Sequence, residues 1–255
     1  MKDFYTRFHQ AAAVSAANAQ FCERLYGKNL YQQGFAEVAH LDHLIEVTGI
    51  GKSSHLLDLG CGNGGIAEYI AEVTDAQVTG IDYIPEAIEI AQARTQPRGE
   101  HLHFQVMDIA HLDFPPASFD VIIAVDTLYF SDLDETLTRM VNLLKPGGRM
   151  GVFYSQSCLP WIDLETFPKE SVQPDGTDLA KAFQRLHLAY QTWDYTAHDD
   201  AHAQRRKILL PELKPLYEQE DRLFLYESYW NEANGVSRAV EGTAHGRYLY
   251  IVTLP

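Results

Sequence analysis

Residues 58–64 combine a carboxylate with three glycines at alternate positions, in the order Asp-Leu-Gly-Cys-Gly-Asn-Gly. Glycine lets the backbone turn freely and lets N–H groups approach a ligand closely. An apolar run at 56–59 precedes the turn and predicts a buried strand, while Ile66, Ala67, Tyr69 and Ile70 after it predict a helix. The positive N-terminal end of that helix would face whatever binds over the turn.

A second acidic residue strengthens this prediction. The apolar run Val78–Ile81 ends in Asp82, which lies 20 residues after Gly62. An acid at the end of the second strand of a βαβ unit is placed to accept the hydroxyls of a ribose. Together the two signals predict a nucleotide-type binding site, and a glycine turn that only packs is the alternative without function.

Two cofactor classes fit the glycines. Gly60, Gly62 and Gly65 match G-x-G-x-x-G, the fingerprint of NAD and FAD sites. Asp58, Gly60, Gly62 and Gly64 also match D-x-G-x-G-x-G. A pyrophosphate favours a turn without a neighbouring carboxylate, whereas S-adenosylmethionine (SAM) brings an ammonium group and a sulfonium. The acid at position 58 therefore favours SAM over a dinucleotide.

With Asp82, Asp108 and the turn Leu144-Lys145-Pro146-Gly147-Gly148, these residues resemble the class I SAM-dependent methyltransferases, of the type that acts on small molecules. In that family an Asp at the place of Asp108 takes the adenine amino group, and the next N–H, here of Ile109, meets a ring nitrogen. The resemblance implies SAM as cofactor, S-adenosylhomocysteine as product, and no metal. The cofactor-binding residues that it implies are Asp58, Gly60, Cys61, Gly62, Asn63, Gly64, Asp82, Tyr83, Asp108, Ile109 and Val125.

The resemblance also implies an α/β fold: a Rossmann-like, doubly wound, seven-stranded sheet of order 3-2-1-4-5-7-6, with strand 7 antiparallel. Apolar runs predict strands at 56–59, 78–81, 103–106, 121–125 and 150–154. Alternating, aromatic-rich runs at 224–230 and 248–253 predict the closing pair of strands. Ser131 with Asp134 resembles a capping box at the start of a helix.

The length of 255 residues predicts a single domain with an appendage. Residues 1–50 are expected to form an N-terminal helical lid, with helices at 11–25 and 36–47, and residues 51–154 the SAM-binding core. Residues 155–220 are expected to form a helical insertion that caps the substrate, with helices at 177–190 and 201–213, the second ending around Pro211 and Pro215. Residues 221–255 are expected to supply the closing strands.

Within the lid, residues 26–34 resemble the connector of phosphoethanolamine-type N-methyltransferases, which touches the cofactor. The resemblance implies cofactor contacts for Tyr31 and Gln32, and an ordinary loop is the alternative. Val14 and Phe130 stand where that family has its catalytic Tyr and His, so its catalytic pair does not carry over.

The acceptor side is less defined. Asp126 follows the strand at 121–125 and is the best-placed candidate for a catalytic base, although it could instead bind the SAM ammonium or the substrate. Tyr129, Tyr190 and Trp193 are candidate substrate-binding residues, and nearby acids such as Asp194 and Asp199 favour a small amine over a phenol or carboxylate. The alternative is that these aromatics form the core of the insertion. His198, His202 and the run 205–207 are expected on the surface.

Composition limits the partners. The net charge of −15 disfavours a nucleic-acid phosphate partner, and no run reaches the ~18 apolar residues of a membrane span. Three cysteines, Cys22, Cys61 and Cys158, without metal spacing suit a reducing cytoplasm. We expect a cytoplasmic monomer or homodimer acting on a small-molecule acceptor. An O- or C-methyltransferase acting on a phenol, carboxylate or other metabolite is the alternative within this class. A SAM-binding protein without transferase activity and a hydride-transfer enzyme are the alternative classes.

Overall fold

The computed structural model describes residues 2–255, apart from the side chain of Arg98. Its seven strands are β1 His55–Leu59, β2 Gln77–Asp82, β3 Leu102–Val106, β4 Phe119–Val125, β5 Leu144–Ser157, β6 Tyr190–Asp194 and β7 His245–Thr253. Its α-helices are α1 Lys2–Val14, α2 Ala16–Tyr26, α3 Val38–Thr48, α4 Gly65–Thr74, α5 Pro85–Thr95, α6 Leu133–Leu143, α7 Asp178–Arg185, α8 Thr196–Gln219 and α9 Leu223–Glu241. Short 3-10 helices lie at η1 Gln96–Arg98, η2 Leu128–Phe130 and η3 Lys169–Val172.

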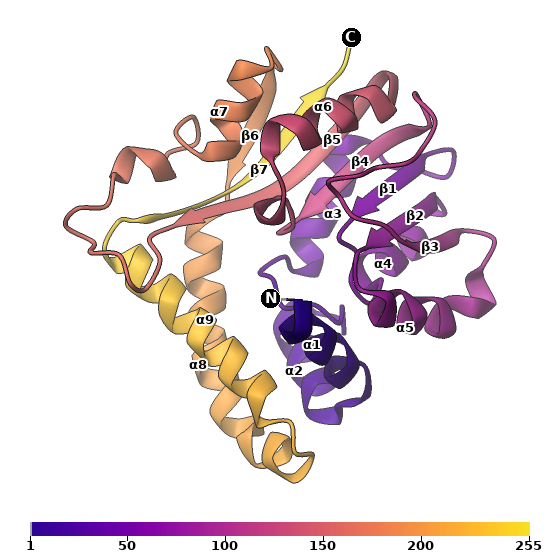
Figure 1. The fold of residues 1–255 in the computed structure, drawn as a ribbon. Helices are drawn as coiled ribbons and strands as arrows, with labels where there is room; N and C mark the ends of the chain where they lie inside the picture. Colours follow the sequence, from indigo (N-terminus) through magenta and orange to yellow (C-terminus); the bar gives the residue numbers. More distant parts are fainter. Residues whose placement is uncertain (1) are drawn as a thin grey trace.

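The seven strands form one sheet of order β3-β2-β1-β4-β5-β7-β6 (Figure 1). Strands β1 to β5 pair in parallel, whereas β7 runs antiparallel to both β5 and β6. The order and the reversed strand confirm the fold predicted from the sequence. The order reverses beside β1, which places a ligand crevice at the carboxyl ends of β1 and β4.

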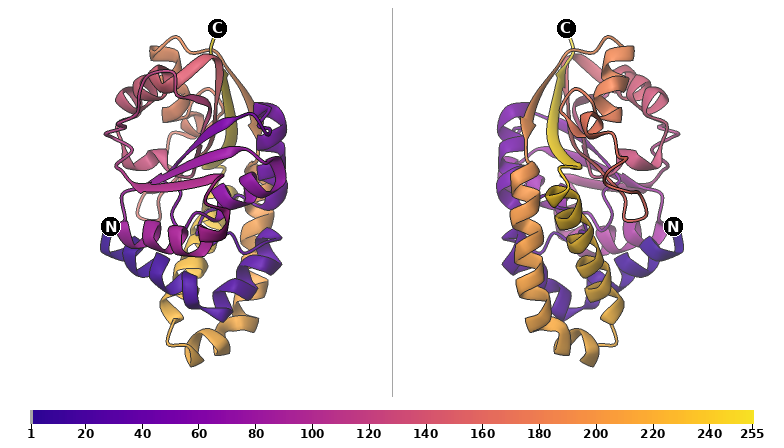
Figure 2. Two further views of the ribbon diagram at one scale, coloured as in Figure 1. Left: turned by 90° about the vertical axis from the view of Figure 1, so that its right-hand side faces the viewer. Right: turned by 90° about the vertical axis from the view of Figure 1, so that its left-hand side faces the viewer.

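Helices cover both faces of the sheet (Figure 2). On one face, Leu56 of β1 and Val121 of β4 pack with side chains of α3, α4 and α5. The next residues along the same strands, Leu57 and Ile122, point to the other face and pack with α6 and α7. This alternation follows the pleat of a strand and explains why the central strands are apolar throughout.

The N-terminal lid differs from its prediction. A single helix was expected over 11–25, but helix begins at Lys2 and is divided at Ser15 into α1 and α2. Ser15 caps α2 by accepting a hydrogen bond from the Asn18 N–H, which is a preferred role for serine. Gly27 ends α2 in the left-handed conformation, which glycine adopts readily at the end of a helix.

Helix α8 runs through both prolines that were expected to end it. Pro211 and Pro215 lie on its exposed side, where the carbonyls that lose their partners can face water. The opposite side, with Leu210, Leu213 and Tyr217, is buried against neighbouring helices. Packing on that side keeps the helix continuous despite the missing N–H groups.

The strand expected at 224–230 is wrong, since these residues begin α9. Leu225, Tyr229 and Ala233 recur at four-residue intervals and form its buried side. The sixth strand is instead β6, which begins at the last residue of the helix expected over 177–190 and continues to Asp194. Helices α8 and α9 form a hairpin that projects beyond the sheet and lies beside α1 and α2 (Figures 1 and 2).

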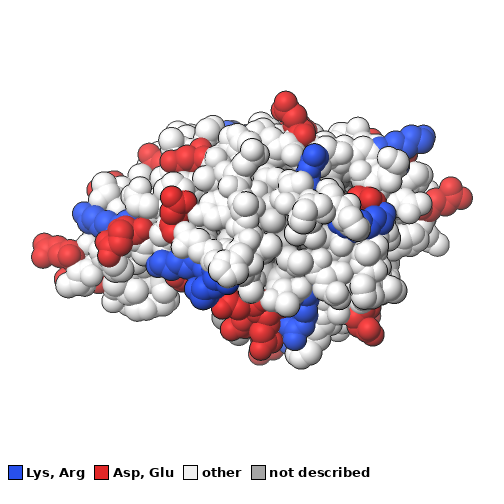
Figure 3. Space-filling model, turned by 90° about the horizontal axis from the view of Figure 1, so that it is seen from above, with Lys and Arg blue, Asp and Glu red and all other residues white. Residues whose placement is uncertain are grey.

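Two smaller features complete the fold. Asp132, not Ser131, caps α6, because its side chain accepts from the Glu135 N–H. On the face seen in Figure 3, acidic and basic side chains form small separate groups between larger uncharged areas. Among residues 2–255, no helix combines the length and apolar character that crossing a membrane requires.

Candidate active site

A cavity of about 990 Å³ opens beyond the carboxyl ends of the central strands. Its walls come from the glycine turn after β1, the ends of β2, β4 and β5, the lid, and both helices of the α8–α9 hairpin. Most of its wall is apolar. The volume lies at the upper end of the range for small-molecule sites, so two ligands could share it.

The glycine turn is covered by the lid. Gly62 has a positive φ of 51°, and a Cβ placed on it would lie 2.6 Å from Cε1 of His9. The Asn63 side chain donates to the His9 carbonyl at 3.0 Å, which ties α1 to the turn. The His9 ring is buried, and burial lowers its pKa to about 4. A neutral imidazole therefore lies over the glycines at neutral pH.

Two buried carboxylates stand beside this turn. Asp82 accepts hydrogen bonds from the N–H groups of Gly62 and Ile84, both at 2.9 Å, which fixes its orientation at the end of β2. Asp58 is 2% exposed, and within the described part of the chain its Oδ2 has no hydrogen-bond partner. Burial, with the charge of Asp82 as a smaller cause, raises the pKa of Asp58 to about 7.

An unpaired, buried carboxyl group is costly unless a cation or a donor reaches it. The ammonium group of SAM would be such a partner, and the backbone next to Asp58 has the close-approach geometry that a cofactor requires. The site therefore fits SAM on its own residues. Among residues 2–255, no group of His, Cys, Asp and Glu side chains is arranged to hold a metal ion.

Most of the residues predicted from the sequence lie together in this cavity. The cofactor candidates on its wall are Tyr31, Gln32, Asp58, Gly60, Cys61, Gly62, Asp82, Tyr83, Asp108, Ile109 and Val125. The acceptor-side candidates Asp126 and Tyr129 are on the same wall. Asn63 and Gly64 are not on it, since Asn63 instead ties the turn to the lid.

Tyr190 and Trp193 do not line the cavity, and their assignment to substrate binding is a correction. Both belong to β6, the edge strand farthest from the glycine turn. The Tyr190 hydroxyl donates to Asp175 at 2.7 Å, and the Trp193 ring packs edge-on against His43. Packing of the sheet edge, rather than a ligand, explains these aromatics.

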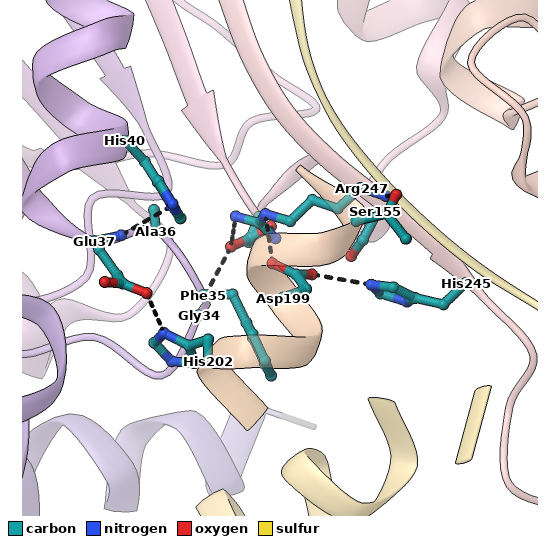
Figure 4. A network of polar contacts seen from close by, with 12 residues as sticks. Gly34, Phe35, Ala36, Glu37, His40, Ser155, Asp199, His202, His245 and Arg247 are labelled. Carbon is teal, nitrogen blue, oxygen red and sulfur yellow. Dashed lines mark hydrogen bonds and ion pairs between the residues drawn. The ribbon is translucent and has the colours of Figure 1, made fainter. Parts of the chain in front are cut away.

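The acceptor side is organised by Arg247, which is 1% exposed (Figure 4). Its two terminal nitrogens donate to the Asp126 carboxylate at 2.6 and 2.8 Å. Asp126 also accepts from the Phe35 N–H at 3.3 Å and from the Tyr129 hydroxyl at 3.4 Å. Four donors match the lone-pair sites of a carboxylate, so these contacts favour a positioning role for Asp126 over that of a base.

A second buried arginine holds the lid loop. Arg206 of α8 donates to the carbonyls of Gln33 and Gly34 at 2.7 and 2.6 Å and pairs with Glu232 at 2.6 Å. The expectation that residues 205–207 form a solvated face is therefore wrong at Arg206, which is fully buried. His202, also expected on the surface, is buried and bonded to Glu37, whereas His198 is exposed.

Several wall residues were missed from the sequence, namely Tyr5, His9, Thr127, Asn231, Glu232, His245 and Arg247. They come from α1, the loop after β4, α9 and β7, which are far apart in the sequence. One local signal could have indicated that Arg247 is a buried, paired residue. It lies in a mostly apolar strand, and a charged side chain that is buried there needs a partner.

The sheet order, the glycine turn and the acid at the end of β2 together define the class I SAM-dependent methyltransferase architecture. Comparison with known families agrees. The model of a family described as a methyltransferase domain matches residues 50–200, which is more than half of the chain. The chain belongs to this methyltransferase-domain family.

Curated relatives cover the same region. The sterol 24-C-methyltransferase erg-4 of Neurospora crassa is 32% identical over 164 residues, which are 63% of this chain and 41% of the relative. The O-methyltransferase cnsE of Penicillium expansum is 35% identical over 133 residues, 49% of this chain and 48% of the relative. The chain thus spans less than half the length of these relatives.

Solved structures resemble the chain over nearly its whole length. Phosphoethanolamine N-methyltransferase 2 of Haemonchus contortus superposes with a TM-score of 0.71 at 17% identity, covering 98% of this chain and 60% of that one. The [4+2]-cyclase SpnF gives a TM-score of 0.60 at 20% identity, covering 84% and 79%. At these identities the likeness shows the fold alone.

Proposed function

We propose that this chain transfers a methyl group from SAM to a small organic acceptor. The observation that carries the proposal is the buried, unpaired carboxyl group of Asp58 beside the glycine turn, in a cavity roomy enough for two ligands. Bound SAM would supply a methyl carbon activated by the sulfonium. The protein aligns the nucleophile with that carbon and excludes water, which can supply on the order of 7–11 kcal/mol in well-oriented reactions.

The charges on the cavity wall limit the acceptor. Arg247 is the one Lys or Arg among the described wall residues, and Asp126 and Asp199 already engage it. No Lys or Arg among the described wall residues remains for a phosphate or carboxylate, and Asp108 adds negative charge to the wall. The cavity suits a largely apolar acceptor that is neutral or cationic and reacts at nitrogen or oxygen.

The sequence favoured an amine because of acidic residues in the insertion. The contacts of two of these acids weaken the argument for an amine. Asp194 accepts a hydrogen bond from the Thr196 N–H, and Asp199 is hydrogen-bonded to His245 and ion-paired with Arg247. Named relatives methylate carbon and oxygen, and the structural neighbour from Haemonchus methylates nitrogen. We keep both nitrogen and oxygen acceptors in the proposal.

Binding is tested by calorimetry with SAM, S-adenosylhomocysteine and NAD, using a matched pair of glycine variants. Gly62→Ala and Gly147→Ala both place a side chain at positive φ, but only the first meets a neighbour, His9. We expect Gly62→Ala to weaken SAM binding at least tenfold and Gly147→Ala to leave it unchanged. Binding of NAD but not SAM would refute the proposal.

Transfer itself is tested with labelled SAM and a panel of phenols and amines. The alternative is a SAM-binding protein without transferase activity, and the resemblance to a cyclase shows that this fold also accompanies other chemistry. Label recovered in at least one acceptor supports transfer. SAM binding without label in any acceptor would favour the alternative class.

A further inference from the structure

His245 is the first residue of β7 and lies opposite Ser157, the last residue of β5. Its side chain is on the cavity wall and only 6% exposed. Ser157 of β5 and Asp199 of α8 lie beside it on the wall, and β4 and β5 separate β7 from β1 and its glycine turn in the sheet. His245 therefore stands on the side of the cavity that an acceptor, rather than the cofactor, would occupy.

One ring nitrogen of His245 is fixed by a carboxylate. Nε2 lies 3.0 Å from Oδ2 of Asp199, which is 1% exposed on the first turn of α8 (Figure 4). An ionised carboxylate only accepts hydrogen bonds, so Nε2 carries the hydrogen and donates it. In the neutral ring, Nδ1 is then left with a lone pair. Nδ1 is buried and has no hydrogen-bond partner among the residues that the structure describes.

Arg247 forms an ion pair with Asp199. Its Nε lies 3.3 Å from the other carboxylate oxygen, Oδ1, while its terminal nitrogens hold Asp126. The arrangement fixes both the tautomer and the orientation of the ring, as a carboxylate does for a catalytic histidine. Asp126, Cys158, Glu232 and Arg247 are among the other titratable or charged groups on the same wall.

We propose that His245, held by Asp199, is the general base for methyl transfer to a weakly acidic hydroxyl, of the phenol or enol type. The inference rests on the proposed function and deepens it. In the step, the acceptor O–H bond breaks and its proton passes to Nδ1. The acceptor oxygen bonds to the methyl carbon, and the carbon–sulfur bond breaks with its electron pair left on sulfur. The imidazolium, stabilised by Asp199, then returns its proton to solvent.

The position of the base favours a hydroxyl over an amine. A hydroxyl carries a lone pair and a proton together, so the proton can leave while oxygen attacks, and a fixed base stabilises that transition state. An ammonium has no lone pair until it has lost its proton, and a neutral amine attacks without a base. A buried, oriented imidazole therefore adds most to hydroxyl methylation.

The test compares para-substituted phenols with labelled SAM in the wild type and in His245→Gln. We expect His245→Gln to lower kcat for phenol by about 10²–10⁴-fold. It should lower kcat for 4-nitrophenol, which loses its proton far more readily than phenol, by much less. The exposed His198→Gln, on the same helix as Asp199, is the control and should change neither rate. Equal losses for both phenols, or none, would overturn the base assignment.

A second substitution separates a base from a structural residue. Asp199→Asn keeps the size of the side chain but removes the carboxylate that accepts from Nε2 and fixes the tautomer of the ring. We expect it to lower kcat for phenol more than kcat for 4-nitrophenol. SAM affinity should stay unchanged in both variants. Equal effects on the two phenols would contradict the dyad.

Two outcomes separate this inference from the proposed function. If the wild type binds SAM and methylates amines but no phenol, the function stands and the inference fails; absence of SAM binding refutes the function itself. Nitrogen NMR of labelled histidine gives a readout that needs no acceptor. We expect neutral His245 to carry its hydrogen on Nε2, and a hydrogen on Nδ1 would overturn the inference whatever the activity.

Discussion

The cofactor side and the acceptor side of the cavity are built in different ways. The cofactor side takes its residues from the ends of successive parallel strands, between positions 58 and 125, and uses backbone turns and carboxylates fixed by nearby N–H groups. The acceptor side joins Asp126, Asp199 and His245 through one buried arginine, Arg247. These four residues come from three distant parts of the chain.

Because of this difference, a substitution on one side should mainly alter binding, and a substitution on the other should mainly alter stability. A residue at a strand end is held by the sheet, so changing its side chain alters binding more than folding. In the acceptor side, each side chain is positioned by another side chain, and removing one leaves buried charges without partners. Variants on the two sides should therefore respond in opposite ways in assays of stability and of SAM affinity.

The largest expected effect is on stability, in Arg247→Met. Removing the guanidinium leaves the buried Asp199 and the partly buried Asp126 without their cation, which should lower the free energy of unfolding by about 3–5 kcal/mol. Denaturant unfolding measures it. Arg185→Met is the matched control, since Arg185 makes a similar two-bond contact with Asp134 but at the surface, and should change stability far less. Equal losses would contradict the comparison.

The same division decides what the sequence could predict. The strands β1, β2 and β4, the glycine turn and the acids at 58, 82 and 108 follow from local patterns of apolar, glycine and acidic residues. Such patterns act within one βαβ unit, where spacing along the chain becomes spacing in the structure. The fold, and the meeting of these acids and the glycine turn on one cavity wall, were predictable for this reason.

The acceptor side was not predictable from local patterns. Residues 224–230 are rich in residues that favour strands, yet packing of Leu225 and Tyr229 against the lid makes them helix. Arg206 and Arg247 are buried because distant carboxylates and carbonyls meet them. Nothing adjacent in the sequence indicates those partners. The aromatics chosen for the pocket, Tyr190 and Trp193, belong to a sheet edge instead.

The second prediction concerns the lid over the glycine turn. His9 has a folded-state pKa of about 4, below its ordinary value of 6.5, because burial disfavours the charged ring. As the pH falls, the unfolded chain therefore takes up the proton at a higher pH than the folded protein does. The stability gained by burying the neutral ring is complete above about pH 6.5, and it falls by up to about 3 kcal/mol toward pH 4. His9→Phe should flatten the dependence in unfolding assays between pH 7 and 4. The exposed His111→Asn should not.

The third prediction concerns Asp82 on the cofactor side. Asp82→Ala should weaken SAM binding about 10- to 100-fold, which corresponds to about 1–3 kcal/mol, because the ribose hydroxyls lose a charged acceptor. Asp120→Ala, at the start of β4, is the control: it should affect the contacts of Asp120 with His55 and Lys145 but not SAM affinity. Calorimetry that shows unchanged affinity for Asp82→Ala would remove it from the site.

The smallest expected effect concerns how SAM binding depends on pH. Burial raises the pKa of Asp58 to about 7 without a ligand, so a bound ammonium must displace a proton at lower pH. Below about pH 7 the α-amino group of SAM stays protonated, and only Asp58 changes charge. Affinity should therefore rise with pH, by at most about tenfold per unit, between pH 5.5 and 7. Asp58→Asn should bind more weakly with little slope, while Asp120→Asn keeps the wild-type slope. A flat wild-type profile by calorimetry would mean that the ammonium does not lie at Asp58.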